Sequence, residues 1–574
     1  MSAMPIDPLN RRDFTKTVAL AGAAMAAIIV LLPATLNAAP AGVEPKQPAA
    51  AVDVFDYWEL ALQVARPDAA NPFTDVAVTG EVVAPSGGEP IRVDGFCDAA
   101  DGSLFRLRFM PSQAGEHSFH VTYQQGAFRT THSGRFTARA SRLAGPVRVD
   151  PEHPFHFIRE GTGKHWFWNA TTTYQLLAWD DQTIAESVDR LAKLGVNRIR
   201  VALTGRTKDG KRWNEPLVVR TAKFAFEMEP WLAARSESLE DPGYDVARFN
   251  LSLYRKAERL LQMCRQRDIV VSLIFYVDGA DRGVDPFGKA AMGGPDEQRY
   301  YRYTIARFAA YANLMWDVAN EYRLFRDDPW AEKMGAFIKE CDPYDHLTST
   351  HGHGDFRFRR SPWADFAMYQ SWDEHGGYAF MLKNRREQAA AGRPMPQVNE
   401  EYGYEDHYPF PWGEKRLWPA RTADTRRRLA WEMTMAGCYQ TTGERANDGT
   451  GAGPDTGGGW VNGRGNEQMT MLLGYRRLMD FFTGLPWWTL EPRDDLAGAG
   501  TLLLAEPGKR YVAYLPQSGA AELTLAAGTY RAKWYNPRTG AWHELPEVKQ
   551  AAAGRWRSAA APDAGDWALL LEAP

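Results

Sequence analysis

Two short acidic motifs in the middle of the chain contain residues that are suited to catalysis. LMWDVANEYR, residues 314–323, runs from apolar residues directly into Asn320 and Glu321, and VNEEYG, residues 398–403, places Glu400 and Glu401 after a second apolar segment. Two carboxyl groups roughly 5 Å apart can break a glycosidic bond with retention, because one protonates the leaving oxygen and the other attacks the anomeric carbon. The motifs favour this chemistry if the fold brings them together.

Glu400 and Glu401 compete for the second role. Successive side chains of a strand point to opposite faces, so only one of the two is expected to face the mouth of a barrel. Alternation does not say which one.

The segments around these motifs alternate between helical periods and short apolar runs. In residues 181–203, Ile184, Val188 and Leu191 share one helix face, and an apolar run follows Gly195. Eight such runs occur, at residues 165–172, 196–203, 269–276, 314–321, 347–354, 366–372, 396–403 and 437–444. Eight β/α units within residues 146–480 predict a (β/α)8 TIM barrel, whose active site lies at the C-terminal ends of the strands.

A doubly wound open sheet is the main alternative to the barrel. The turn after the first apolar run contains no GxGxxG, which is the fingerprint of a nucleotide-binding open sheet. We therefore favour the barrel, with Glu321 and one glutamate of the second motif at its mouth.

Both flanks of the barrel read as β structure. Residues 52–140 alternate strictly in places: in LFRLRF, Phe105, Leu107 and Phe109 fall on one face, and Arg106 and Arg108 on the other. Residues 490–574 again show short strand patterns separated by turn signals. The fold class is therefore predicted as α/β, a TIM barrel flanked by N-terminal and C-terminal β-sandwich-like domains.

The N-terminus resembles an export signal. Residues 1–41 contain Arg11-Arg12, then an apolar run and small residues, which is the order of a twin-arginine signal with cleavage after Ala38 or Ala41. The alternative is an uncleaved anchor, since the apolar run is near membrane-spanning length. Either reading puts the bulk of the protein outside the cytoplasm, and after cleavage we expect a periplasmic or secreted protein without stable membrane insertion.

Charge and cysteine spacing give no support for binding nucleic acid or zinc. The 574 residues have a formal net charge of −4, which gives no electrostatic reason to bind nucleic acid. The four cysteines have no CxxC spacing, so the sequence contains no zinc-binding motif built on cysteine pairs. We interpret them as structural thiols. Glycosidic chemistry with two carboxyl groups needs no cofactor. The sequence does not indicate an oligomeric state.

The acidic motifs also resemble a known family. WDVANEY is similar to the Asn-Glu signature of the large clan of barrel glycoside hydrolases with the acid/base on strand four, and NEEYG resembles its strand-seven motif. By matching position, the resemblance implies that Glu321 is the acid/base and Glu401 the nucleophile. It also implies that Arg200, in GVNRIRV, orients the nucleophile and that Asn320 contacts the sugar 2-hydroxyl.

The flanking domains extend this resemblance. Residues 71–121 look like an uncharacterised β domain found ahead of bacterial barrel glycosidases, and the tail resembles the collagen-binding-type β domain that accompanies apiosidase-like barrels. Together these similarities cover nearly the whole mature chain. Strand one, NATTTYQLLAW, shows no acidic residue, so no substrate contact is transferred to it.

Further residues at the predicted strand ends are candidates for substrate contact. His351 ends strand five, Tyr369 ends strand six near the nucleophile, and Trp372 and Trp460 follow strands six and eight where their rings can stack on a sugar. His351, His353 and Asp355 are also considered as a metal site. We predict no metal, because a third and fourth ligand are not evident.

These expectations combine into one function. We expect an exported retaining glycoside hydrolase that acts on a plant, algal or microbial polysaccharide or oligosaccharide. The alternative is a noncatalytic carbohydrate-binding surface protein with a relic barrel. Metal-assisted hydrolysis through His351 and His353 is a third reading.

Overall fold

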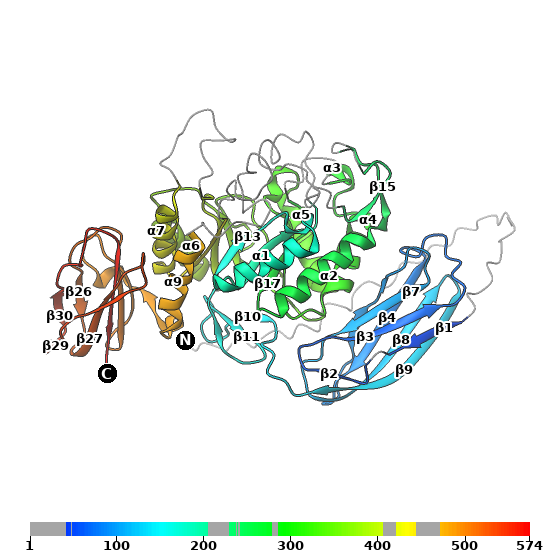
Figure 1. Cartoon of the computed structure of the whole chain (residues 1–574), viewed down its shortest axis with the longest axis horizontal. Coiled ribbons are helices and arrows are strands. Elements are labelled where there is room, and N and C mark those ends of the chain that lie inside the picture. The colour runs from blue at the N-terminus through cyan, green and yellow to red at the C-terminus, as the bar shows by residue number, and fades with distance from the viewer. Residues whose placement is uncertain are drawn as a thin grey trace, which may run out of the picture. The chain divides into compact units, whose positions relative to one another are not determined.

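The computed structural model describes residues 42–47, 49–204, 229–236, 238, 241–277, 285–405, 421–443 and 471–574. Residues 40–574 form one compact unit, whose elements are labelled in Figure 1. The predicted signal segment 1–41 and Trp460 lie outside the described residues. Within the described ranges, no helix has the length and apolar character needed to cross a membrane.

Eight parallel strands form the centre of the chain. They are β13 (Ala170–Thr172), β14 (Arg198–Ala202), β17 (Val270–Ile274), β18 (Leu314–Asp317), β19 (Thr348–Ser349), β20 (Ala367–Gln370), β21 (Gln397–Glu401) and β22 (Tyr439–Thr442). Their order is β19-β18-β17-β14-β13-β22-β21-β20. Each strand falls inside one of the eight predicted runs, so the barrel prediction is confirmed.

The two end strands of this order also meet. Ser349 Oγ donates to the Phe366 carbonyl at 2.6 Å, and the Asp365 amide donates to the Thr348 carbonyl at 2.9 Å. These bonds join the β19 and β20 segments and nearly close the sheet into a barrel, which an open doubly wound sheet does not do.

Helices connect the strands and pack on the outside of the barrel. The helices are α1 (Asp181–Lys193), α2 (Leu251–Arg265), α3 (Gly288–Ala291), α4 (Pro295–Phe308), α5 (Asp328–Cys341), α6 (Gly377–Ala390), α7 (Ala423–Met435) and α9 (Met471–Thr483). α2 contacts β17, α5 contacts β19, and α7 contacts β22. Figure 1 labels α2 and β17 of the first of these pairs. Side chains of Asp180, Asp327 and Thr422 cap α1, α5 and α7 by accepting backbone N–H bonds.

The N-terminal domain is a pair of sheets. One contains β1 (Val43–Lys46), β3 (Trp58–Val64), β7 (Leu104–Phe109) and β6 (Phe96–Cys97); the other contains β2 (Ala51–Asp53), β9 (Phe128–Arg139), β8 (Gly115–Gln125), β4 (Val76–Val83) and β5 (Ile91–Asp94). Phe105, Leu107 and Phe109 of β7 are buried as predicted. Arg108 is buried too, against the alternation, because it packs on the barrel.

The C-terminal domain is also built from antiparallel strands. Its main sheet contains β23 (Glu491–Pro492), β24 (Leu502–Glu506), β25 (Arg510–Leu515), β31 (Trp567–Glu572), β27 (Gly528–Tyr535), β28 (Trp542–Glu544) and β29 (Val548–Gln550), and a second pair contains β26 (Glu522–Leu525) and β30 (Gly554–Arg557). This domain has a hydrophobic core of its own. Both flanking β domains are therefore as expected.

Smaller strands complete the described parts of the chain. β10 (Val147–Val149), β11 (Phe157–Arg159) and β12 (His165–Trp166) form a sheet ahead of the first barrel strand, and β15 (Trp231–Ala233) pairs with β16 (Tyr244–Phe249) before α2.

All four cysteines are free, and burial raises the thiol pKa of Cys97, Cys341 and Cys438 to about 12.

A buried ion network joins the N-terminal domain to the barrel. Arg307 of α4 donates to Asp98 at 2.9 Å and to Glu258 of α2 at 2.8 Å. Arg108 of β7 lies 2.8 Å from Glu59 and 2.5 Å from the same Glu258. Because Glu258 is shared by both arginines, the network fixes the domain against α2 and α4.

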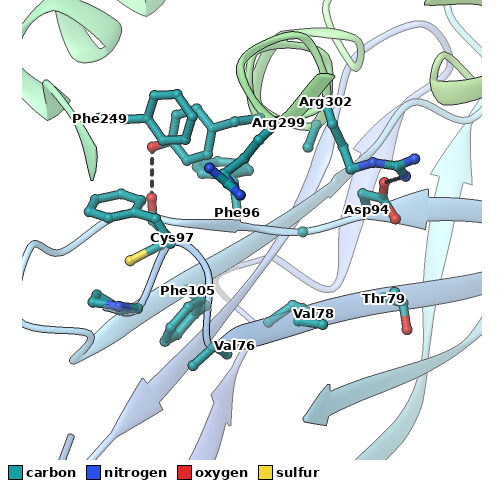
Figure 2. Close-up of a pocket in the computed structure, with 16 residues that line it drawn as sticks. Val76, Val78, Thr79, Asp94, Phe96, Cys97, Phe105, Phe249, Arg299 and Arg302 are labelled. Carbon is teal, nitrogen blue, oxygen red and sulfur yellow. Dashed lines mark hydrogen bonds and ion pairs between the residues drawn. The ribbon is translucent and has the colours of Figure 1, made fainter. Parts of the chain in front are cut away.

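A cavity of about 300 Å³ lies beside this network, between the N-terminal sheets and α4 (Figure 2). Phe96, Phe105 and Phe249 contribute aromatic walls, and Arg302 lies 2.8 Å from Asp94 at one side. The contact between the two domains is therefore charged at its centre and incompletely filled next to it.

Replacing Arg307 by Leu is expected to destabilise the protein by about 3–5 kcal/mol, because Asp98 and Glu258 would stay buried with one partner fewer. Chemical denaturation measures the loss. Arg299→Leu, on the same helix and paired only with Asp296 near the surface, is the control and is expected to cost about 1 kcal/mol or less. Equal losses in both variants would contradict this role for the network.

Candidate active site

Glu401 lies at the C-terminal end of β21 and is surrounded by donors. The hydroxyl of Tyr174 donates to its Oε1, and Arg200 Nη1 donates to the same oxygen at 3.3 Å. Gln370 Nε2 donates to Oε2 at 3.1 Å, and His351 Nε2 lies 3.5 Å from Oε1. The carboxylate is thus held through both oxygens at the barrel mouth.

This environment favours the ionised carboxylate. Burial alone raises the pKa of Glu401, but nearby His351, the charge of Arg200 and the Tyr174 hydrogen bond outweigh it and lower the pKa to about 2. Glu401 is therefore a carboxylate at neutral pH, which is the form that a nucleophile or an electrostatic stabiliser needs.

Arg200 organises the centre of the site. From β14, its Nη2 donates to Asn320 Oδ1 at 2.7 Å, and its Nη1 donates to the Tyr174 hydroxyl at 3.0 Å. The hydroxyl oxygen of Tyr174 and Asn320 Oδ1 are 3.0 Å apart. Glu401, Asn320 and Tyr174 therefore share one guanidinium, and the structure brings the predicted residues Arg200, Asn320 and Glu401 together.

Glu321 lies just beyond β18 rather than within it. Its backbone is left-handed, with φ 48° and ψ 43°, and a 3-10 turn (Tyr322–Leu324) follows. A left-handed conformation costs a residue other than glycine about 1–2 kcal/mol. The amide of Asn320 donates to the Tyr276 carbonyl at 2.9 Å and that of Tyr322 to His351 at 3.2 Å, so the backbone is anchored on both sides of the turn.

Two side chains connect Glu321 to Glu401. His353 Nδ1 lies 3.8 Å from Glu321 Oε1 and 3.0 Å from Gln370 Oε1. Since Gln370 also donates to Glu401, the two glutamates lie on either side of one short chain of contacts. Both carboxyl groups therefore belong to the same mouth, as the sequence predicts.

The strand alternation behind the expectation that only one of Glu400 and Glu401 faces the mouth is interrupted at the end of β21. In the pairing of β20 with β21, Tyr369 is opposite Asn399 and Gln370 is opposite Glu401, so Glu400 is an extra residue in a β-bulge. Arg200 Nε lies 3.1 Å from Glu400 Oε1, and Arg200 Nη1 lies 3.3 Å from Glu401. Both side chains thus reach the same arginine.

Glu400 nevertheless has a different environment from Glu401. It is fully buried, pairs with Arg198, and accepts from Thr441 Oγ1 at 3.1 Å. Its partners lie inside the barrel, whereas those of Glu401 include Tyr174, Gln370 and His351 at the rim of the strands. The geometry favours Glu401 as the reacting carboxylate and Glu400 as the counter-charge of the arginines.

Tyr369 does not contact the predicted nucleophile. Its hydroxyl donates to Gln397 at 2.7 Å and accepts from Arg359 at 3.0 Å. The next residue, Gln370, takes the expected place beside Glu401, because the bulge shifts the register by one residue. The prediction for Tyr369 is therefore corrected to Gln370.

Of the other residues considered for the site, Trp372 and His351 lie in it and Asp355 does not. Trp372 lies at the site, with its ring centroid 5.9 Å from that of Tyr404, and His351 is buried beside Glu401. Asp355 pairs instead with Arg323 at 3.0 Å and Arg357 at 2.6 Å. Among the described residues, no group of three or more His, Cys, Asp or Glu side chains is placed to hold a metal ion.

Tyr174 and Tyr404 are site residues that the sequence analysis missed. Tyr174 follows β13, and its hydroxyl contacts Glu401, Arg200, Asn320 and the Tyr404 hydroxyl, the last at 3.1 Å. The available signal was position, since the Tyr174 hydroxyl lies just past the end of strand one, where a barrel places its site. NATTTYQLLAW contains no acidic residue, the residue type on which the two catalytic predictions depend.

Tyr174→Phe is expected to lower kcat/KM about 10- to 100-fold, since one hydrogen bond to a charged group is worth about 1.5–3 kcal/mol. Removing this donor raises the pKa of Glu401 above its value of about 2. For a reaction that uses ionised Glu401, the acid limb of the pH profile is then expected to move to higher pH. An unchanged profile with unchanged kcat/KM would contradict the role of Tyr174.

Known proteins agree with this architecture. The chain matches the family described as "Apiosidase-like, catalytic domain" over residues 153–445. The flanks match a domain of unknown function, DUF5060, over residues 51–124 and the "Putative collagen-binding domain of a collagenase" over residues 499–572. No protein of curated function matches the sequence.

Solved structures show the same fold. A structure described as a "putative glycoside hydrolase from Bacteroides vulgatus ATCC 8482" has a TM-score of 0.73 at 21% identity, covering 91% of this chain and 100% of that chain. A family 5 glycoside hydrolase from the same organism has a TM-score of 0.56 at 14% identity, covering 75% of this chain and 94% of that chain.

The nearly closed parallel barrel and its flanking β domains thus give this chain the same fold as these two structures, which are described as glycoside hydrolases. Because the catalytic-domain match spans more than half of the sequence, the chain belongs to the apiosidase-like family. This confirms the resemblance to apiosidase-like barrels and to the two flanking β domains.

Proposed function

We propose that the protein is a retaining glycoside hydrolase that uses Glu401 as nucleophile and Glu321 as acid/base. The observation that supports this most strongly is the pair of carboxyl groups at one barrel mouth, of which Glu401 is buried and held ionised by Arg200, His351 and Tyr174. A relic barrel would have no physical need for this arrangement, which places a charge in a buried site at a desolvation cost.

The proposed reaction is a double displacement. In the first step a Glu401 oxygen bonds to the anomeric carbon, the bond to the leaving oxygen breaks, and the proton of Glu321 goes to that oxygen. In the second step Glu321 takes a proton from water, the water oxygen bonds to the anomeric carbon, and the ester to Glu401 breaks. In this proposal Asn320, whose Oδ1 accepts from Arg200, hydrogen-bonds the sugar 2-hydroxyl.

The proposed substrate is a plant, algal or microbial polysaccharide or oligosaccharide. Support comes from the family, whose description names an apiosidase, and from Trp372 near the site, whose ring can stack on a sugar. Apiosides therefore belong in the first set of substrates to be tested.

Covalent trapping tests this proposal. The protein is screened against aryl glycosides, including an apioside, and incubated with the 2-deoxy-2-fluoro glycosides of the same sugars. Peptide mass spectrometry is expected to find one fluorosugar on Glu401. A label on another residue would reject the assigned nucleophile, and hydrolysis with inverted configuration would reject the retaining mechanism.

We also propose export by the twin-arginine route, on the basis of the residues in segment 1–41. Replacing Arg11 and Arg12 by Lys is expected to leave the protein in the cytoplasm, because the paired arginines are read by the export receptor. Cell fractionation and immunoblotting of both forms measure this. Substituting Lys16 by Arg keeps the charge and leaves the pair intact, so that form should still be exported.

A further inference from the structure

Gln370 and His353 form a bridge between the two proposed catalytic carboxyl groups. Gln370 Nε2 donates to Glu401 Oε2 at 3.1 Å, and Gln370 Oε1 lies 3.0 Å from His353 Nδ1. The same Nδ1 lies 3.8 Å from Glu321 Oε1. The backbone amide of Gln370 also donates to the carbonyl of His353 at 3.1 Å, which fixes the two residues to each other.

The charge of Glu401 decides the direction of these hydrogen bonds. An ionised carboxylate only accepts, so Gln370 must present its NH2 group to Glu401 and its oxygen to His353. An amide oxygen also only accepts, and the hydrogen of His353 must therefore be on Nδ1.

We propose that the Gln370–His353 bridge is a positioning unit whose Nδ1 hydrogen stabilises whichever proposed catalytic carboxylate is charged. This inference rests on the proposed function, because it concerns the two steps of double displacement. Neither residue exchanges a proton with the substrate.

The movement of charge during the reaction gives the bridge its role. Before the first step Glu401 is the carboxylate, and Gln370 donates to it while His353 supports the amide oxygen. After that step Glu401 is an ester and Glu321 has lost its proton, so the negative charge has moved to Glu321. The Nδ1–H group then gains a charged acceptor in Glu321, and the 3.8 Å separation is expected to shorten into a hydrogen bond.

Differences in burial indicate that Gln370 and His353 act on different carboxyl groups. The Glu401 side chain is 3% exposed and that of His353 is 51% exposed. Gln370 thus acts on the buried carboxylate and His353 on the acid/base at the rim. The loss of His353 should therefore affect the second step, in which Glu321 acts as a base, more than the first.

The first test needs no substrate. In protein labelled with ¹⁵N-histidine, His353 is assigned by its loss in His353→Asn, and its nitrogen shifts are expected to show the Nδ1–H tautomer. Gln370→Leu removes the acceptor and is expected to return His353 toward the Nε2–H tautomer that free imidazole prefers. Nε2–H in the unsubstituted protein would overturn the bridge.

The second test separates the two steps with a 2,4-dinitrophenyl glycoside that the protein hydrolyses, because this leaving group needs no acid. Under these conditions the second step is expected to limit kcat. His353→Phe is expected to lower kcat about tenfold, the equivalent of one hydrogen bond. His353→Asn, whose amide can replace the Nδ1–H donor, is expected to recover most of that loss, and His120→Gln in the N-terminal domain serves as the control.

The outcomes of the two tests are distinguishable. Equal losses in His353→Phe and His353→Asn would overturn the role of the Nδ1 hydrogen. No hydrolysis of any glycoside together with the Nδ1–H tautomer would reject the proposed function, and with it the role of the bridge in catalysis, but would leave the bridge itself in place.

Discussion

Glu401→Ala is expected to lower kcat/KM by on the order of 10⁴-fold or more, because the variant cannot form the glycosyl-enzyme ester. The substitution also empties a place that Arg200, Tyr174 and Gln370 surround with donors. A small anion such as azide or formate should bind there and attack the anomeric carbon in place of the carboxylate.

Rescue by azide tests the role of Glu401 more specifically than the loss of kcat/KM does, because the product reports the direction of attack. The attack occurs from the side of the missing carboxylate, so the glycosyl azide should have the anomeric configuration opposite to that of the substrate. Proton NMR of the product determines this configuration. Azide that restores no turnover, or that gives a product of retained configuration, would contradict Glu401 as nucleophile.

Glu400→Ala is the matched control, since it removes the neighbouring carboxylate. Glu400 is the buried partner of Arg198 and lies 3.1 Å from Arg200. Its removal leaves two buried guanidinium groups short of a counter-charge and is expected to cost about 3–5 kcal/mol of stability. Activity then falls with the loss of folded protein, and azide should not restore it. Azide rescue of this variant instead would exchange the roles of the two residues.

The barrel was predictable because its signal is repeated along the chain. Each of the eight apolar runs contains one parallel strand, and a helix such as α2 shows its buried face in the spacing of Leu253, Ala257 and Leu261. The strands are shorter than the runs that contain them, since several apolar residues belong to turns at the barrel ends. Glu321, for example, lies beyond the end of β18.

Parts of the site were not predictable because they depend on contacts between distant segments. Tyr174 is recognisable only after closure of the barrel brings it to Glu401, 227 positions away. A bulge in β21 places Gln370, and not Tyr369, beside Glu401, and it brings both Glu400 and Glu401 to Arg200. Strand alternation along the sequence does not reveal this bulge. Arg108 is buried by its pairing with α2, which lies 150 positions further along the chain.

The strained backbone at Glu321 allows its chemical role to be separated from its structural cost. Glu321→Gln is expected to lower kcat/KM about 10²- to 10⁴-fold on glycosides with a poor leaving group, because these need the proton that the amide cannot supply. On a 2,4-dinitrophenyl glycoside the first step should change little. Rates across a series of aryl leaving groups measure this, and a uniform loss over the series would contradict Glu321 as the acid.

Glu321→Gly and Glu321→Ala provide a matched pair for the stability of this turn. Both remove the carboxyl group and should lose acid catalysis equally, but glycine adopts φ 48° without the Cβ clash that alanine keeps. After allowing for the greater chain entropy of glycine, we expect Glu321→Gly to be more stable than Glu321→Ala by about 1 kcal/mol in chemical denaturation. A more stable alanine variant would mean that the left-handed turn stores no strain. The expected order would mean that the protein accepts a local cost in stability in order to direct this carboxyl group into the barrel mouth.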